Sequence, residues 1–211
     1  MAQFFTVHPE QPQPRLIRQA AEIVRGGGLI ALPTDSAYAL GGRVGDPQVI
    51  ERIRRIRRVD DRHHLTLVCR DLSEIAHYGR VDNAQYRLLK AATPGSYTFI
   101  LEGTKELPRR VLHSRRKTIG LRVPDHPLVR ALLAELDGPL MSSSLILPDE
   151  TEPLSDPEEI RHRLEKEVDV IIDAGPCAPR ATTIIDLTAG APELIRLGAG
   201  DPTLLGIEMP D

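Results

Sequence analysis

The sequence predicts an α/β fold built around a mixed β-sheet. Segments with helical spacing of apolar residues alternate along the chain with short apolar runs that are typical of strands. Two strand-like runs follow each other closely near the end of the chain, which favours strand pairing there. The chain has 211 residues, without an internal repeat or a Gly/Ser/Pro-rich linker. We therefore expect one domain over residues 1–211.

Proline and aspartate mark the starts of the expected helices. Asp46 and Asp156 each stand directly before a proline, which is the order of an N-cap followed by the first helical residue. His126 precedes a proline in the same way but is a weaker cap. The expected helices span residues 15–25, 47–58, 84–92, 127–136 and 157–167.

Short apolar runs bounded by turn residues predict the strands. Three successive glycines, Gly26 to Gly28, end the first helix and turn the chain into the first strand. They precede a strand instead of joining a strand to a helix, so they form neither a P-loop nor a dinucleotide-binding motif. The expected strands span residues 29–32, 65–68, 97–101, 118–123, 139–143, 168–172, 182–187 and 193–197.

The overall composition excludes several classes of protein. The formal net charge of −3 excludes a polycationic nucleic-acid coat. The two cysteines, Cys69 and Cys177, lie far apart without a CxxC pair, and the histidines lack zinc spacing, so neither a disulfide framework nor a metal site is indicated. The sequence shows no signal peptide and no run of 18 apolar residues, so we expect a cytoplasmic protein without a membrane partner.

Positive charge is nevertheless concentrated in two stretches of the chain. Residues 52–70 carry seven arginines and residues 105–122 carry seven further cations, whereas residues 149–169 carry nine acids. One interpretation is that these stretches are solvated faces; the other is that they line an anion-binding cleft. Arg55 and Arg57 end the expected helix 47–58, where they complement the helix dipole or reach a polyphosphate bidentately.

Nucleophilic catalysis is not indicated. Ser142, Ser143 and Ser144 lack the flanking glycines of a nucleophile elbow, and no histidine pattern nearby marks an activating base. His63 and His64 are adjacent, and neighbouring residues of a strand point to opposite sides, so we interpret them as solvated or core histidines.

The most specific segment is residues 29–41, which read Leu-Ile-Ala-Leu-Pro-Thr-Asp-Ser-Ala-Tyr-Ala-Leu-Gly. It resembles the PTDTVYGLG signature of the YrdC/YciO family, the threonylcarbamoyl-adenylate synthases of tRNA modification. Further segments resemble motifs of this family in the same order, namely residues 55–57, 93–101, 121–127, 142–144, 182–187 and 194–198. The opening segment, residues 4–17, is most similar to the YciO branch.

The resemblance implies an α/β twisted open sheet of the YrdC-like type, with flanking helices and a basic concave face. It also implies an enzyme that combines L-threonine, bicarbonate and ATP with Mg²⁺ into threonylcarbamoyl-AMP and pyrophosphate. This product supplies the threonylcarbamoyl group of N6-threonylcarbamoyladenosine in tRNA. No permanently bound metal is implied.

The resemblance extends to individual residues. It implies catalytic roles for Thr34, Arg57 and Ser144. It implies nucleotide or substrate binding for Tyr38, Arg55, Arg122, Ser142, Thr182 and Arg196. Arginines suit this chemistry, because attack of a carbamate oxygen on the α-phosphorus builds negative charge on the phosphates. From the residues alone, Thr34 with Asp35 is also typical of a turn at a strand end, and Tyr38 of a core aromatic.

Three departures from the family pattern support a second hypothesis. Arg55 replaces the family's lysine, the loop 57–65 is about two residues longer and lacks both prolines, and Ile146 stands in place of an asparagine. The first hypothesis is an ATP-dependent threonylcarbamoyl-AMP synthase. The second is a nucleotide-binding or double-stranded RNA- or tRNA-binding protein of the YciO branch with little or no synthase activity.

Overall fold

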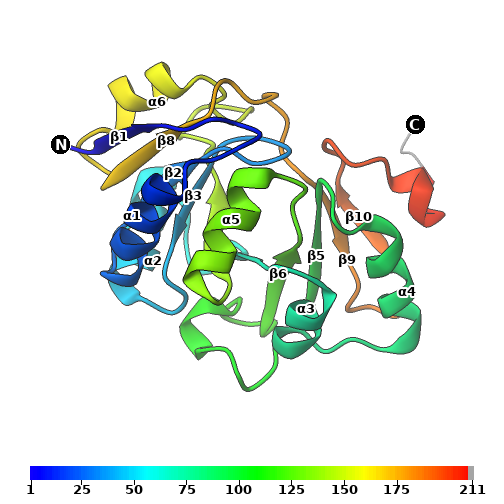
Figure 1. Cartoon of the computed structure of the whole chain (residues 1–211). Coiled ribbons are helices and arrows are strands. Elements are labelled where there is room, and N and C mark those ends of the chain that lie inside the picture. The colour runs from blue at the N-terminus through cyan, green and yellow to red at the C-terminus, as the bar shows by residue number, and fades with distance from the viewer. Residues whose placement is uncertain (209–211) are drawn as a thin grey trace.

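Ten strands form one twisted mixed sheet that is open at both edges (Figure 1). The computed structural model describes residues 1–208, and this count refers to them. The order across the sheet is β1-β8-β2-β3-β7-β4-β6-β5-β9-β10. The strands are β1 (Gln3–Thr6), β2 (Ile30–Leu32), β3 (Ala39–Gly42), β4 (Thr66–Val68), β5 (Tyr97–Glu102), β6 (Thr118–Arg122), β7 (Leu140–Ser144), β8 (Val170–Asp173), β9 (Thr183–Asp186) and β10 (Glu193–Arg196).

Six α-helices flank this sheet in the described part of the chain. They are α1 (Pro14–Arg25), α2 (Pro47–Arg57), α3 (Leu72–Tyr78), α4 (Asn83–Ala92), α5 (Pro127–Leu136) and α6 (Pro157–Leu164). The predicted N-caps are confirmed, because the Asp46 and Asp156 carboxylates each accept two backbone N–H bonds from the first turn of their helix. His126 makes no such side-chain bond at the start of α5. None of these helices is long and apolar enough to cross a membrane.

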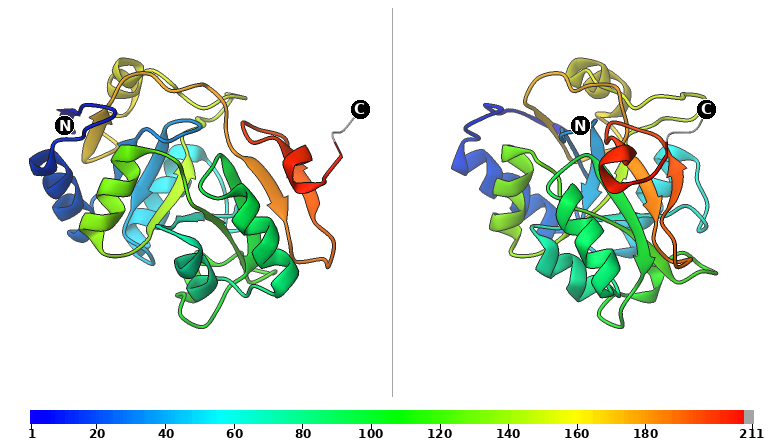
Figure 2. Two further views of the ribbon diagram at one scale, coloured as in Figure 1. Left: turned by 45° about the vertical axis from the view of Figure 1, so that its right-hand side comes forward. Right: turned by 90° about the vertical axis from the view of Figure 1, so that its right-hand side faces the viewer.

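The helices pack on two hydrophobic clusters. One cluster joins α1 and α5 to β1, β2 and β8, with Ile17, Leu132 and Ile172 among its buried members. The other joins α2, α3 and α4 to the middle of the sheet, with Ile53 and Phe99 completely buried. Figure 2 shows that the C-terminal strands β9 and β10 lie on the opposite side of the molecule from α1.

The predicted α/β class and all predicted elements are confirmed, with boundary shifts. The helix expected at 157–167 is the shorter α6, which ends at Leu164. Two strands and one α-helix were not predicted, namely β1, β3 and α3, and neither were two short 3-10 helices at Arg109–Val111 and Pro202–Leu205. Strand β3 has a weak strand pattern because it contains Gly41, yet an added Cβ there would lie 2.7 Å from Leu140 Cδ2. Packing therefore requires glycine at this point in the sheet.

Candidate functional site

A polar cavity lies over the sheet between β3 and β10. Its side chains come from the end of α2, the loop that follows it and seven neighbouring strands or their ends. It is lined by Ala39, Arg57, His63, His64, Thr66, Thr98, Arg122, Ser142, Ser143, Ser144, Thr182, Ile184 and Arg196. Most of these residues are charged or carry hydroxyl groups, so the cavity suits a polar ligand.

Strand register forms the floor of the cavity. Ser142 of β7 lies opposite Thr66 of β4, and Thr66 lies beside Gly120 of β6. A Cβ at Gly120 would approach the Thr66 hydroxyl to 2.9 Å and a Thr98 methyl to 3.0 Å. The glycine thus lets the threonines on the neighbouring strands approach each other, and a larger residue would intrude among the side chains that line the cavity.

Arg57, the last residue of α2, reaches the cavity from above β7. Its Nε donates to the carbonyl of Ile146 (3.2 Å), and its Nη1 bonds the Ser143 hydroxyl (2.5 Å) and His63 Nε2 (2.8 Å). Burial, together with the nearby charge of Arg196, lowers the pKa of Arg57 to about 10. Arg57 therefore remains a cation near neutral pH, in a fixed orientation.

Arg122 enters the cavity from the end of β6 as part of a buried ion pair. Its Nη2 donates to a carboxylate oxygen of Asp35, and both side chains are less than a tenth exposed. The Nε–H of Arg122 is buried without a partner among the described residues. Burial lowers the pKa of Arg122, and the Asp35 charge opposes that shift. An orphaned buried donor beside a polar cavity is typical of a ligand site.

Arg196 of β10 supplies the third guanidinium. Its Nε and Nη2 donate to the carbonyl of Thr182, at 3.2 and 2.9 Å. The hydroxyl of Thr182 in turn bonds the hydroxyl of Thr98 (2.8 Å). Burial and the charge of Arg122 lower the pKa of Arg196. The cavity therefore collects three cationic side chains, and Arg122 alone of the three pairs with a carboxylate among residues 1–208.

His63 and His64 both line the cavity, contrary to the interpretation of them as solvated or core histidines. His63 bonds Arg57, whereas His64 Nε2 bonds the Thr118 hydroxyl (2.8 Å). Burial and neighbouring positive groups lower the pKa of each histidine to about 4. The rule that adjacent residues point to opposite sides fails here, because residues 58–65 form a loop instead of a strand.

Six of the nine residues singled out from the sequence line this cavity: Arg57, Arg122, Ser142, Ser144, Thr182 and Arg196. Thr34 does not. Its hydroxyl donates to the carbonyl of Ala37 (2.7 Å) and accepts the backbone N–H groups of Ser36 and Ala37, so it fixes a turn between β2 and β3. This turn positions Asp35 against Arg122.

Tyr38 and Arg55 also lie outside the residues that line the cavity. Tyr38 is completely buried, and its hydroxyl donates to the carbonyl of Gly175 (2.9 Å). Burial raises the pKa of this phenol, so it stays protonated. Arg55 is largely exposed and pairs with Glu167 (2.7 Å). The structure thus places Tyr38 in the core and Arg55 in a surface ion pair.

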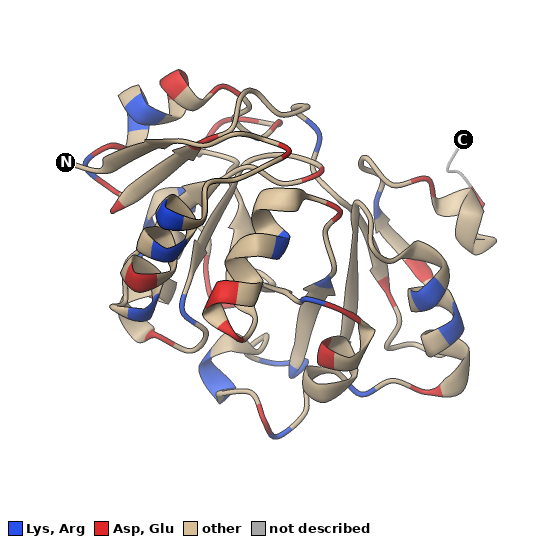
Figure 3. Cartoon of the chain, viewed as in Figure 1, with Lys and Arg blue, Asp and Glu red and all other residues tan. Residues whose placement is uncertain are grey.

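The first arginine-rich stretch is largely paired with acids. Within residues 52–70, five arginines form ion pairs: Arg52, Arg55, Arg58, Arg62 and Arg70. Figure 3 shows both signs of charge interspersed over the helices. From the second stretch, residues 105–122, only Arg122 lines the cavity. Most of this charge is therefore solvated surface, and one arginine from each stretch contributes to the site.

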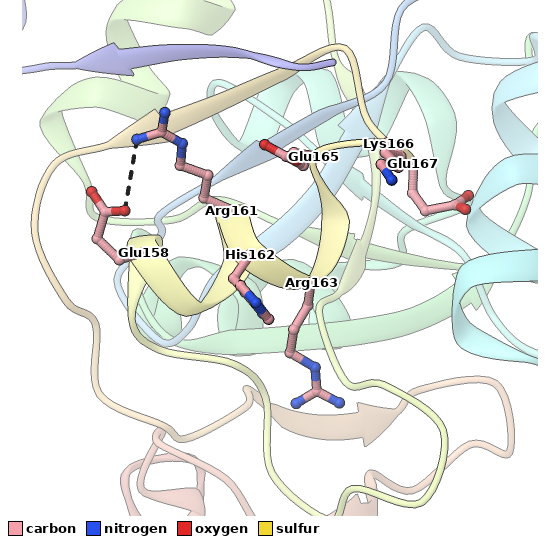
Figure 4. A pocket seen from close by; sticks show the side chains of 7 residues that line it. All are labelled: Glu158, Arg161, His162, Arg163, Glu165, Lys166 and Glu167. Carbon is pink, nitrogen blue, oxygen red and sulfur yellow. Dashed lines mark ion pairs between the residues drawn. The ribbon is translucent and has the colours of Figure 1, made fainter.

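A separate depression lies along α6 (Figure 4). Its lining holds three acids, three cations and a histidine: Glu158, Glu165, Glu167, Arg161, Arg163, Lys166 and His162. Arg161 pairs with Glu158 (3.8 Å), and Arg163 pairs with Glu159 and Glu150. The charges balance, so this depression lacks the excess of positive charge that distinguishes the cavity over the sheet.

The contributors to the cavity that the sequence reasoning missed include Asp35 as the partner of Arg122, His63, His64, Thr66, Ser143 and Thr98. Asp35 carried a signal, because it lies inside the most specific segment of the sequence. The family resemblance implied roles for Ser142 and Ser144 alone, yet Ser143 between them also lines the cavity. Nothing in the local pattern marked Thr98.

Comparison with known proteins places these features in a family context. The sequence model of the Sua5/YciO/YrdC family, described as "Telomere recombination", matches residues 22–198. The chain is 56% identical to the uncharacterized protein YciO of Escherichia coli over 201 residues, which cover 95% of this chain and 98% of that protein. The crystal structure of E. coli YciO has a TM-score of 0.95 at 55% identity and covers 97% of this chain and 100% of that chain.

More distant relatives have a named activity. A threonylcarbamoyl-AMP synthase of Alkalilimnicola ehrlichii is 30% identical over 188 residues, which cover 87% of this chain and 97% of the relative. The structure of P. abyssi Sua5 complexed with L-threonine has a TM-score of 0.84 at 25% identity. That match covers 92% of this chain and 57% of the P. abyssi chain.

Proposed function

The chain belongs to the Sua5/YciO/YrdC family, and from this premise we propose that it is a threonylcarbamoyl-AMP synthase-like nucleotidyltransferase. Its substrates are ATP as the Mg²⁺ complex, bicarbonate and L-threonine, and its products are threonylcarbamoyl-AMP and pyrophosphate. Similarity to a named threonylcarbamoyl-AMP synthase and to a Sua5 structure with L-threonine supports the reaction class. The product serves tRNA modification.

One observation carries the proposal: three guanidiniums, Arg57, Arg122 and Arg196, meet in one cavity that is otherwise lined largely by hydroxyl groups. Arg57 and Arg196 pair with no carboxylate among residues 1–208, so a phosphate chain suits the cavity, because guanidiniums bind phosphate oxygens bidentately. The buried Nε–H of Arg122 also requires an acceptor.

The proposed reaction is an in-line displacement at the α-phosphorus. The threonine amine and bicarbonate first form a carbamate with loss of water. A carbamate oxygen then attacks this phosphorus, and the bond to the pyrophosphate oxygen breaks. Negative charge grows on the phosphate chain as the leaving group departs. Arg57, Arg122 and Arg196 offset this charge, and little reorganisation is needed because other residues already hold each of them.

Ser142 and Ser144 supply neutral donors in this proposal. Both line the cavity, and the structure records no side-chain hydrogen bond for either among residues 1–208. Ser142 is nevertheless buried. Their hydroxyls are thus available to phosphate or carbamoyl oxygens, and the bond between Thr98 and Thr182 fixes the opposite wall.

Pyrophosphate release tests the function directly. The protein is incubated with ATP, Mg²⁺, bicarbonate and each amino acid in turn. We expect pyrophosphate with L-threonine and none without an amino acid. Mass spectrometry identifies the adenylated product. Absence of threonine-dependent pyrophosphate under conditions where ATP binds would contradict the synthase proposal.

Nucleotide or RNA binding without efficient turnover is the second candidate, and Ile146 favours it. Ile146 stands where the family motif carries an asparagine, and its carbonyl holds Arg57. An aliphatic side chain adds no hydrogen bond to the site. Filter binding of duplex RNA at two ionic strengths tests the RNA version, since phosphate contacts weaken steeply with salt.

A further inference from the structure

Three of the five N–H hydrogens of the Arg57 guanidinium already have partners. The Nε–H donates to Ile146, and the two hydrogens of Nη1 serve Ser143 and His63. For Nη2 the structure records no hydrogen bond within residues 1–208. The guanidinium is therefore fixed at three points and keeps one nitrogen for a ligand of the cavity.

The bond to Arg57 also determines the form of the His63 ring. Nε2 faces a permanent donor and must accept, so the single proton of the neutral ring resides on Nδ1. The ionisable groups that face His63 are Arg54 and Arg57 of α2, Arg196 of β10 and the neighbouring His64. None of them is an acid. Burial and these groups hold the pKa of His63 at about 4, so the neutral ring prevails near neutral pH.

Two roles are conceivable for such a histidine in the proposed reaction. A general base must offer a free nitrogen to the proton that it removes. Nε2 of His63 is already engaged by Arg57 and lies 3.3 Å from the Ser143 hydroxyl, and a pKa near 4 makes the ring a weak base. The geometry therefore excludes Nε2 as the base and leaves positioning.

We propose that His63 is a positioning residue whose neutral Nε2 holds the Arg57 guanidinium so that Nη2 faces a phosphate oxygen of the bound nucleotide. The inference rests on the proposed function, since it assigns the nucleotide phosphates to this side of the cavity. It also gives a role to the loop 58–65, which departs from the family pattern and supplies this histidine.

Two amide substitutions separate the positioning role from mere space filling. The amide oxygen of glutamine stands the same number of bonds from Cβ as Nε2 of histidine, whereas the oxygen of asparagine is one bond shorter. We expect His63→Gln to keep the affinity for MgATP within about threefold and His63→Asn to weaken it about tenfold or more, which is the effect of one hydrogen bond that holds a charged group. His162→Asn, at the exposed α6 depression, is the matched control and leaves the affinity unchanged.

Calorimetry measures these affinities, and thermal melting verifies that each variant folds. If His63→Gln and His63→Asn lose equal affinity for MgATP and melt at unchanged temperatures, the positioning role is overturned. The glutamine oxygen, placed as Nε2 is, would then have no effect on binding. Arg57→Ala combined with His63→Asn provides a further check. The double variant should lose less MgATP binding free energy than the sum of the two single variants, since both changes act on the same guanidinium.

Nitrogen NMR of the histidine-labelled protein tests the inference without any nucleotide. We expect the Nδ1–H tautomer of His63 at pH 7, with no protonation above about pH 5. The Nε2–H tautomer would overturn the inference, because that nitrogen then cannot accept from Arg57. If MgATP does not bind the unaltered protein, the proposed function fails, and the tautomer alone decides whether His63 holds Arg57.

Discussion

Arg122 and Asp35 form an ion pair whose side chains are only 6% and 9% exposed. The Ser96 hydroxyl also holds Asp35 in place, because it lies within hydrogen-bond distance of the backbone carbonyl (3.2 Å) and of the second carboxylate oxygen (3.1 Å). Asp35 comes from the turn between β2 and β3, whereas Arg122 ends β6. The pair therefore ties two strands that are not neighbours in the sheet, at one side of the cavity.

Removal of Asp35 should destabilise the protein strongly. Asp35→Ala leaves a buried guanidinium without its anion, which typically costs about 3–5 kcal/mol. The double variant Asp35→Leu/Arg122→Met removes both charges and should lose less stability than Asp35→Ala. Urea unfolding measures each free energy. Asp125→Ala, which breaks the exposed pair with Arg130, is the control and should cost less than about 1 kcal/mol. If Asp35→Ala and Asp125→Ala lower the free energy of unfolding by similar amounts, the interpretation of Asp35 and Arg122 as a buried, tightly coupled pair is contradicted.

Arg57→Ala should weaken ATP binding. The loss of charge-assisted hydrogen bonds to phosphate amounts to about 1.5–3 kcal/mol. Arg57→Lys should recover only part of this, because an ammonium does not fork onto two oxygens. Arg55→Ala is the matched control on the same helix end, where the side chain pairs with Glu167 instead of lining the cavity. Isothermal titration that shows equal affinities for all three variants would remove Arg57 from the site.

Gly120→Ala should impair both stability and ligand binding. The new Cβ would lie 2.9 Å from the Thr66 hydroxyl and 3.0 Å from a Thr98 methyl. Overpacking of this kind costs about 1–3 kcal/mol. Gly138→Ala is the control, because a Cβ there meets nothing within 4 Å. The comparison uses melting and ATP titration, and equal behaviour of the two alanine variants would show that the floor of the cavity tolerates a methyl group.

Stability should fall as the solution becomes acidic, and His63 and His64 should contribute. Their pKa values are about 4 in the folded protein and near 6.5 when unperturbed. As pH falls from 6.5 toward 4, the unfolded chain binds protons that the folded protein rejects. Over this range, each histidine lowers the free energy of unfolding by up to about 1.4 kcal/mol per pH unit. His126, whose pKa is also lowered by burial, acts in the same direction.

The double variant His63→Gln/His64→Gln tests this origin of the pH dependence. Its free energy of unfolding should vary less between pH 6.5 and 5 than that of the unaltered protein, with the remaining slope supplied by His126 and other groups. Denaturant titrations at a series of pH values provide the comparison. An unchanged slope would assign the acid sensitivity to groups outside the cavity.

Ile146→Asn should raise threonine-dependent pyrophosphate release if the missing amide limits turnover. A donor aimed at developing charge is worth at most about 2–4 kcal/mol, and the gain should be smaller here because the surroundings are not shaped for an amide. The competing outcome is an unpaired amide that lowers stability by about 1–3 kcal/mol. Turnover and melting are measured on the same variant. A less stable protein with unchanged turnover would show that the asparagine is not the limiting difference.

Local patterns were sufficient for the fold class and for the helix starts. Asp46 and Asp156 cap their helices because a carboxylate before a proline satisfies the first free N–H groups, and no distant contact is needed. β3 was missed because the reason for its glycines lies in other elements: Gly41 lies against Leu140 of β7, and Gly42 lies against Val49 of α2. The expectation of one domain over 1–211 stays a prediction, which the continuous sheet supports.

The candidate site was less accessible to sequence reasoning. Arg55 and Arg57 stand two positions apart on a helix, so their side chains point in widely different directions, and only Arg57 lines the cavity. Thr34 and Tyr38 belong to the most specific segment, yet their hydroxyls bond backbone carbonyls. His63 depends on a loop whose path no periodicity predicts.

The parallel pairing of β9 with β5 affects the order in which a nascent chain acquires its cavity. Arg57 and Arg122 leave the ribosome well before Thr182 and Arg196, which form the last wall. Until β9 pairs with β5 and β10 pairs with β9, Arg57 and Arg122 line an incomplete cavity. The cavity is therefore completed late in synthesis, when β9 and β10 have emerged and joined the sheet.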